Sequence, residues 1–241
     1  MKQSDPSRRR ARHAESCAQC KVAVEDMLRA EFGAFGVVRK EEQVPVRPAP
    51  HVLMDNPAWQ TLAPVYAALQ DYSGPDDYLG TAKMCRSDML VESPGFIVEL
   101  DESHHMTEAR AVALRALPST VRLGFDKAHW IDLCERRHNR RRSPLDLKTR
   151  GKNVRSAWAD LVRDVVHLLS PERFTAPTVR LQMGHIEWCR MCPTSTEDRA
   201  AFRRQLGGLP PSLGHRGRSD RIDKIRTPLA SPQPPRVLGL D

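Results

Sequence analysis

Two short apolar segments, residues 88–91 and 96–100, constrain the fold of this chain more than any other feature. The turn-forming sequence Ser93-Pro94-Gly95 separates them, which predicts an antiparallel hairpin. Strand alternation places Glu99 and Asp101 on the same face of the second strand. Leaving both carboxylates ionised without a partner on a half-buried strand would cost several kcal/mol. A metal cation or basic side chains must therefore compensate them, and Mg²⁺ prefers such oxygen ligands.

Hydrophobic periodicity and turn signals predict the elements around this hairpin. Helical patterns are expected at residues 17–32, 57–71, 107–116, 127–138 and 154–169. Further short strands are expected at 121–125 and 179–183, whereas 34–53 and 139–152 read as irregular connections. The mixture of strands and helices along the chain predicts an α/β protein.

The length of 241 residues and the hydrophobic content of 40% suit one principal domain. We expect a flexible basic arm at 1–15, an α/β domain at 16–204 and a disordered tail rich in Pro and Arg at 205–241. The sequence has no apolar run of about eighteen residues to span a bilayer, and its N-terminus lacks the apolar segment of a secretory signal. We therefore expect a soluble cytoplasmic protein with no membrane partner.

Positive charge indicates the kind of partner. The formal net charge is +8, which would concentrate a polyanion near the surface, and nucleic acid is the commonest intracellular polyanion. Arginine runs at 8–10 and 140–142 could contact such a partner, or they could simply be solvated and mobile.

The cysteines form two pairs with the spacing of metal ligands. Cys17 and Cys20 make one C-x-x-C, and Cys189 and Cys192 make another. Four thiolates from two such pairs could form a tetrahedral zinc site, although their separation is too long for a compact zinc module. Burial is the alternative, because Cys17 and Cys20 also fall at helical spacing with the apolar residues that follow them.

The hairpin also resembles a known nuclease pattern. Asp88 begins the first strand, Glu99 follows eleven residues later on the second, and Asp101 and His105 continue the run. In this region the chain resembles the PD-(D/E)XK nuclease superfamily and, within it, the very-short-patch-repair endonucleases and their small uncharacterised relatives. Relatives of the repair type continue from the strand acid as Glu-x-Asp-Gly-x-x-His, and Glu99, Asp101 and His105 occupy the matching positions.

The resemblance implies a restriction-endonuclease-like mixed sheet flanked by helices, and hydrolysis of phosphodiester bonds in nucleic acid, with DNA expected first. Asp88, Glu99 and the Leu100 carbonyl would hold Mg²⁺ or Mn²⁺, while Asp101 would orient the attacking water. His105, or secondarily its neighbour His104, would serve as general base or as a donor to the phosphate.

Three further residues are candidates by position. Glu25 lies on the helix expected before the sheet, where an acid often joins the metal site in this superfamily. Arg110 and Arg115 fall on the helix after the hairpin and could clamp phosphate.

The sequence also departs from the family pattern. Ser87 replaces the usual Pro, Glu102 replaces Gly, and Asp101 stands where most members have a Lys. An Asp cannot supply the positive charge of that Lys. Two alternatives to the nuclease therefore remain, namely a catalytically inactive nuclease fold that binds nucleic acid and an interaction protein organised by zinc.

Overall fold

The structure is a computed structural model that describes residues 17–33, 36, 38–44, 46–74, 79, 86–140 and 145–207, without the side chains of 137–140 and 145–150. The expected basic arm at 1–15 and all but the first three residues of the expected tail at 205–241 lie outside the described residues.

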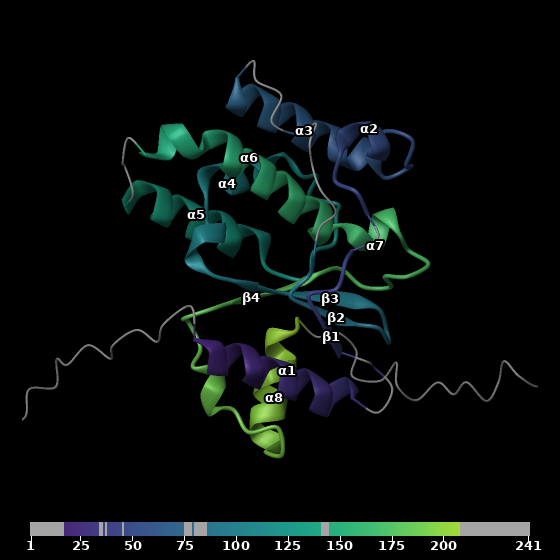
Figure 1. Cartoon of the computed structure of the whole chain (residues 1–241), viewed down its shortest axis with the longest axis vertical. Helices are drawn as coiled ribbons and strands as arrows, with labels where there is room; N and C mark the ends of the chain where they lie inside the picture. The colour runs from purple at the N-terminus through teal and green to yellow at the C-terminus, as the bar shows by residue number, and fades with distance from the viewer. Residues whose placement is uncertain are drawn as a thin grey trace, which may run out of the picture.

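A mixed sheet lies between two layers of helices (Figure 1). Its four strands, in spatial order, are β1 (Val38–Lys40), β2 (Met89–Val91), β3 (Phe96–Asp101) and β4 (Val179–Gln182). β2 is antiparallel to both of its neighbours, β1 and β3, and β4 runs parallel to β3. The predicted α/β class with a mixed sheet is therefore confirmed.

Helices α1 (Ala18–Phe32) and α8 (Thr196–Gln205) cover one face of the sheet. The other face carries α2 (Pro50–Leu53), α3 (Trp59–Ser73), α4 (Glu108–Ala116), α5 (Lys127–Arg140), α6 (Leu145–Asp164) and α7 (Val166–Leu169). Two 3₁₀ turns, η1 (Ser103–His105) and η2 (Trp188–Arg190), follow β3 and β4. The predicted positions of α1, α3, α4 and α5 are confirmed to within two residues at each end.

Three sequence-based expectations are wrong. Residues 145–152 belong to α6 rather than to a loop. Leu is a good helix former, and so are Lys and Arg despite their charge. Residues 34–53 contain β1 and α2. The strand expected at 121–125 reduces to one bridge between Gly124 and Val179, where a Cβ on Gly124 would lie 2.5 Å from the Thr178 carbonyl oxygen.

The predicted antiparallel hairpin is confirmed. Met89 pairs with Val98 and Val91 pairs with Phe96 across the turn. Gly95 has a φ of 98°, and a side chain there would collide with the Arg173 carbonyl oxygen, so the turn depends on this glycine.

Strand alternation divides the interior into two cores. Phe96, Val98 and Leu100 join the core under α1 and α8, whereas Ile97 joins the core under α3, α4 and α6. Glu99 and Asp101 therefore point with Ile97 toward the second helical layer, as the sequence predicted.

Thr107, the N-cap of α4, lies two residues after the histidine pair, and its hydroxyl caps the first turn of this helix. Thr107 Oγ1 accepts a hydrogen bond from the Arg110 amide at 3.1 Å. We expect Thr107→Ala to lower the free energy of unfolding by about 1 kcal/mol, because an amide of the first turn loses its acceptor. Thr107→Ser keeps the hydroxyl and should lose clearly less. Chemical denaturation measures both, and equal losses would show that the methyl group matters rather than the cap.

Candidate functional site

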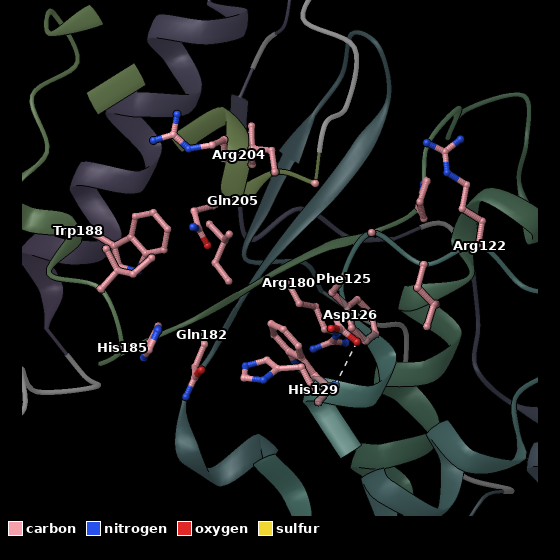
Figure 2. A pocket seen from close by; sticks show the side chains of 18 residues that line it. Arg122, Phe125, Asp126, His129, Arg180, Gln182, His185, Trp188, Arg204 and Gln205 are labelled. Atoms are coloured by element: carbon pink, nitrogen blue, oxygen red, sulfur yellow. Dashed lines mark hydrogen bonds between the residues drawn. The ribbon is translucent and has the colours of Figure 1, made fainter. Parts of the chain in front are cut away.

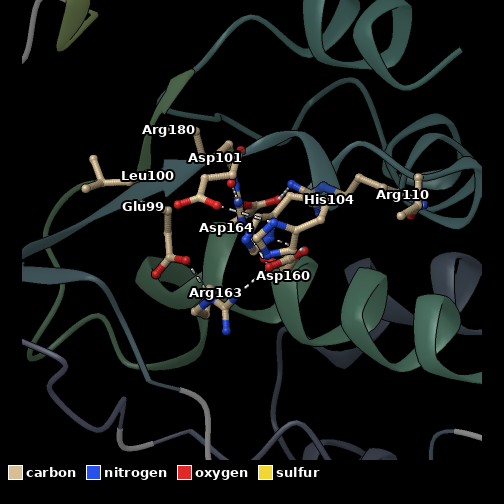
Figure 3. A network of polar contacts seen from close by, with 12 residues as sticks. Glu99, Leu100, Asp101, His104, Arg110, Asp160, Arg163, Asp164 and Arg180 are labelled. Atoms are coloured by element: carbon tan, nitrogen blue, oxygen red, sulfur yellow. Dashed lines mark hydrogen bonds and ion pairs between the residues drawn. The ribbon is translucent and has the colours of Figure 1, made fainter. Parts of the chain in front are cut away.

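A buried network of acids and arginines lies between the sheet and the second helical layer (Figure 3). It brings together side chains from β3, β4, α4 and α6, which are far apart in the sequence. Its members are Glu99, Asp101, Arg110, Asp160, Arg163, Asp164 and Arg180.

Arg180, on β4, is the centre of this network. Its Nη1 lies 2.6 Å from Asp101 Oδ1, its Nε lies 2.5 Å from Asp164 Oδ1, and its Nη2 donates to the Asp160 carbonyl at 3.2 Å. Burial disfavours the charged guanidinium, but Asp101 and Asp164 hold the pKa of Arg180 well above its usual value. Arg180 is therefore charged and fully engaged.

Each oxygen of the Asp101 carboxylate accepts a hydrogen bond from a protein donor. Arg180 occupies Oδ1, and the indole Nε1 of Trp130 donates to Oδ2 at 2.8 Å. The side chain is 2% exposed. Arg180 and Trp130 therefore leave less of this carboxylate for a water, which is the role that the resemblance implies for Asp101.

Arg110 faces the protein interior, in contrast to the expectation that it clamps phosphate. It is 2% exposed and its Nη2 pairs with Asp164. Its position between the buried Ala109 and Ala111 on α4 explains this orientation. Arg115, the other expected phosphate ligand, is half-exposed and pairs with Glu135 on α5.

Glu99 is compensated only in part. Its Oε2 lies 3.2 Å from Arg163 Nε, whereas its buried Oε1 has no hydrogen-bond partner among the described residues. Burial raises the pKa of Glu99 to about 7, although Arg163 and Arg180 oppose the shift. A buried carboxyl poised near neutrality is a common property of functional sites.

Asp88 and Glu99 are brought together across the hairpin, as the sequence predicted. The register continued by one residue before β2 sets Asp88 opposite Glu99. Asp88 Oδ2 accepts a hydrogen bond from the Leu100 amide at 2.7 Å, and its charge contributes to the raised pKa of Glu99. Leu100 therefore contacts this pair through its amide, whereas the resemblance implies that its carbonyl would hold the metal.

Glu25 is not brought to this pair. It lies on α1, which covers the opposite face of the sheet, and it pairs with Lys40 and with Arg29 Nη2, the latter at 2.9 Å. Burial favours a higher pKa for Glu25, but Lys40 and Arg29 lower it overall. Among the described residues, the acids do not form a group of three with ligand atoms close enough to share one ion.

The two histidines of η1 differ in environment, although their ring centroids are 4.2 Å apart. His105 Nδ1 lies 3.6 Å from Asp160 Oδ2. Burial favours a lower pKa for His105, but Asp160 raises it overall. His104 is 66% exposed, and partial burial together with the neighbouring His105 lowers its pKa. His105 is therefore the histidine that retains a proton more readily.

Lys21 is a functional candidate that the sequence reasoning missed. Its Nζ lies 2.7 Å from Glu102 Oε1, just beyond β3. The hydrogen bond that Lys21 donates to Glu102 raises the pKa of Lys21, and the charge of Asp88 adds to the shift. Lys21 thus brings positive charge to the end of the hairpin that carries Asp88.

Three network members on α6 were also missed. Asp160, Arg163 and Asp164 sit within the apolar stripe that ends this helix. Charged residues at i, i+3 and i+4 inside a buried stripe are the signal that could have revealed them.

A cavity of about 480 Å³ opens beside β4 (Figure 2). Arg180 and the buried Trp130 form part of its lining, so it adjoins the network. Four exposed basic side chains also line it, namely Arg122, His129, His185 and Arg204. They come from separate segments, and no local pattern in the sequence marks them.

The cysteine pairs converge on the other side of the sheet. The Sγ atoms of Cys17, Cys20 and Cys189 all lie within 4.8 Å of one another, so this group could hold a metal such as zinc. Burial raises the pKa of the Cys20 thiol to about 12. The Cys192 Sγ instead lies 3.1 Å from Thr194 Oγ1.

No family model matches this chain, and the comparison with curated proteins and with solved structures found no match. Within the described ranges, none of the helices has the length and apolar character needed to cross a membrane.

The raised pKa of Glu99 predicts a pH-dependent stability. Between about pH 4.5 and pH 7 the folded protein keeps a proton that the unfolded chain has lost, so stability falls as the pH rises through this window. Glu99→Gln removes the titration. We expect its stability relative to the wild type to rise across the window by roughly 3 kcal/mol and then to stay level.

Denaturation at several pH values measures this difference. Glu92→Gln, at the turn of the same hairpin, is the matched control for losing one carboxylate. A change in the pH dependence of stability that Glu99→Gln shows and Glu92→Gln does not is assigned to the titration of Glu99. A difference between Glu99→Gln and the wild type that is constant with pH would contradict the prediction.

Proposed function

We propose that this protein is a nuclease that uses Mg²⁺ or Mn²⁺ to hydrolyse phosphodiester bonds in nucleic acid, with DNA the first substrate to test. The observation that carries the proposal is the pairing of Asp88 with Glu99, whose buried Oε1 has no hydrogen-bond partner among the described residues. An unsatisfied carboxylate oxygen next to a second carboxylate is costly unless a cation compensates it.

The fold is compatible with the resemblance that first suggested this activity. A restriction-endonuclease-like protein is expected to have a mixed sheet flanked by helices, and this chain has that arrangement. Asp88 at the start of one hairpin strand and Glu99 on the next also follow the expected order.

The donor set fits a divalent cation in part. Asp88 and Glu99 would hold the ion, whereas Asp101 is already occupied by Arg180 and Trp130. When bound, Mg²⁺ would supply Lewis acidity to the phosphodiester and lower the pKa of water. In this proposal Asp101 is a positioning residue, because it fixes Arg180 beside Glu99.

His105 is assigned as a proton donor to the phosphate. The sequence left it open whether this residue is a base or a donor. Because Asp160 raises the pKa of His105 above its ordinary value, this ring holds a proton more readily than a free histidine, which suits donation rather than abstraction.

Lys21 offers the positive charge that Asp101 cannot supply at the usual lysine position. It approaches Asp88 from α1 instead of from β3, and its contact with Glu102 keeps it protonated. We assign it the role of stabilising negative charge at the phosphate.

Cleavage assays test the proposal. We expect the full chain to cleave at least one of supercoiled plasmid, duplex DNA, single-stranded DNA or RNA with Mg²⁺ or Mn²⁺, and to lose activity in EDTA. Asp88→Asn and Glu99→Gln should each lower the rate by about 100-fold or more, because a charged ligand is lost while side-chain shape is kept.

Glu92→Gln removes an exposed carboxylate from the same hairpin and should retain activity. Thermal melts establish that each variant is folded. Equal activity in wild type, Asp88→Asn and Glu99→Gln, or no metal-dependent cleavage of any substrate, would overturn the hydrolytic proposal.

The main alternative is an inactive fold that binds nucleic acid. The contacts of Arg180 and Trp130 with the two oxygens of Asp101 favour it, because they hold Asp101 in a structural role. The cavity beside β4 would then provide the contact, through the exposed Arg122 and Arg204. This alternative predicts metal-independent binding that weakens with salt, and a lower salt dependence in Arg122→Ala and Arg204→Ala. Arg190→Ala, at an exposed arginine paired with Glu187, is the control.

A further inference from the structure

We propose that Cys17, Cys20, Cys189 and Cys192 bind one structural zinc ion, which joins the start of α1 to the segment that follows β4. This inference does not depend on the nuclease proposal. It uses a different face of the sheet and different residues.

The positions of three sulfur atoms carry the argument. Cys17, at the N-cap of α1, and Cys20, in its first turn, meet Cys189 of η2 with all Sγ atoms within 4.8 Å of one another. Tetrahedral Zn–S bonds of about 2.3 Å place ligand sulfurs a little under 4 Å apart, so only small movements are needed. The Cys189 amide also donates to Cys20 Sγ at 3.4 Å.

Core packing does not explain all four cysteines, although Cys17 is partly buried against the same core as Cys20. Cys20 is 1% exposed and packs with Val24, Met27 and Leu28, as an apolar stripe would require. Cys189 and Cys192 are exposed. A cysteine is among the most buried residue types, so two exposed cysteines at ligand spacing need another explanation.

Cys192 is assigned as the fourth ligand. It follows Cys189 at the same spacing that separates Cys17 from Cys20, and both pairs have the C-x-x-C form of structural zinc sites. Its side chain is exposed and contacts the Thr194 hydroxyl, so no core packing opposes its turning toward the other thiols.

The ion would close a very long loop. The ligands come from both ends of the described chain, and α1 and α8 already contact each other through the ion pair of Arg199 Nε with Glu31 Oε1 at 2.5 Å. Cross-linking distant segments removes conformational freedom from the unfolded chain, and binding free energy at such a site becomes folding free energy. The zinc would therefore stabilise the helical layer formed by α1 and α8.

Metal analysis of the purified full chain tests the inference. We expect about one zinc ion per chain, and a Tm that falls by roughly 5–10 °C on chelation and recovers with added zinc. Cys17→Ser and Cys189→Ser should lose the metal, whereas Cys134→Ala, which alters a buried cysteine in the other core, should keep it. A chain that contains no zinc and whose Tm is insensitive to added zinc would overturn the proposal.

Cobalt substitution tests the fourth ligand separately. Co²⁺ bound to four thiolates should lose about a quarter of its sulfur charge-transfer absorption in Cys192→Ser, with zinc affinity lowered at least about tenfold. An unchanged spectrum and affinity in Cys192→Ser would overturn the role of Cys192. The Cys134→Ala spectrum should match the wild type.

Discussion

The pairing of Arg180 with Asp101 and Asp164 is the interaction on which the packing of helices α2 to α7 against the sheet depends. One guanidinium on β4 joins β3 to α6, with none of the three side chains more than 2% exposed. Removing one member of such a group leaves an uncompensated buried charge, at a cost of roughly 3–5 kcal/mol. The network therefore sets how the helical layer sits over the sheet, and with it the surroundings of Glu99.

This network divides the two acids of β3 into different roles. Asp101 receives two strong donors and needs no further cation, whereas Glu99 receives one arginine contact and keeps a bare oxygen. The sequence placed both acids on one face, but it could not show that their compensation would be so unequal. Unequal compensation leaves Asp88 and Glu99, the expected metal ligands, as the candidate site and sets Asp101 apart from it.

Local rules predicted the hairpin, its turn at Ser93-Pro94-Gly95 and the faces of β3, because each depends on residues a few positions apart. The partners of the acids were not predictable in this way. Arg163 and Arg180 follow Glu99 and Asp101 by more than sixty residues, and only the parallel placement of β4 beside β3 brings Arg180 into contact. The partner of Arg110, Asp164, is likewise 54 residues away, so the expectation that Arg110 faces a phosphate took no account of the buried acid that it meets.

Helix α1 connects the two proposals physically without making either depend on the other. Cys20 faces the core and Cys189, whereas the next residue, Lys21, reaches Glu102 and the charge of Asp88. Successive residues of a helix point about 100° apart, so a metal that fixes Cys20 also fixes the direction of Lys21. The orientation of the first turn of α1 thus determines both how α1 and α8 are held together and how much positive charge reaches Asp88 and Glu99.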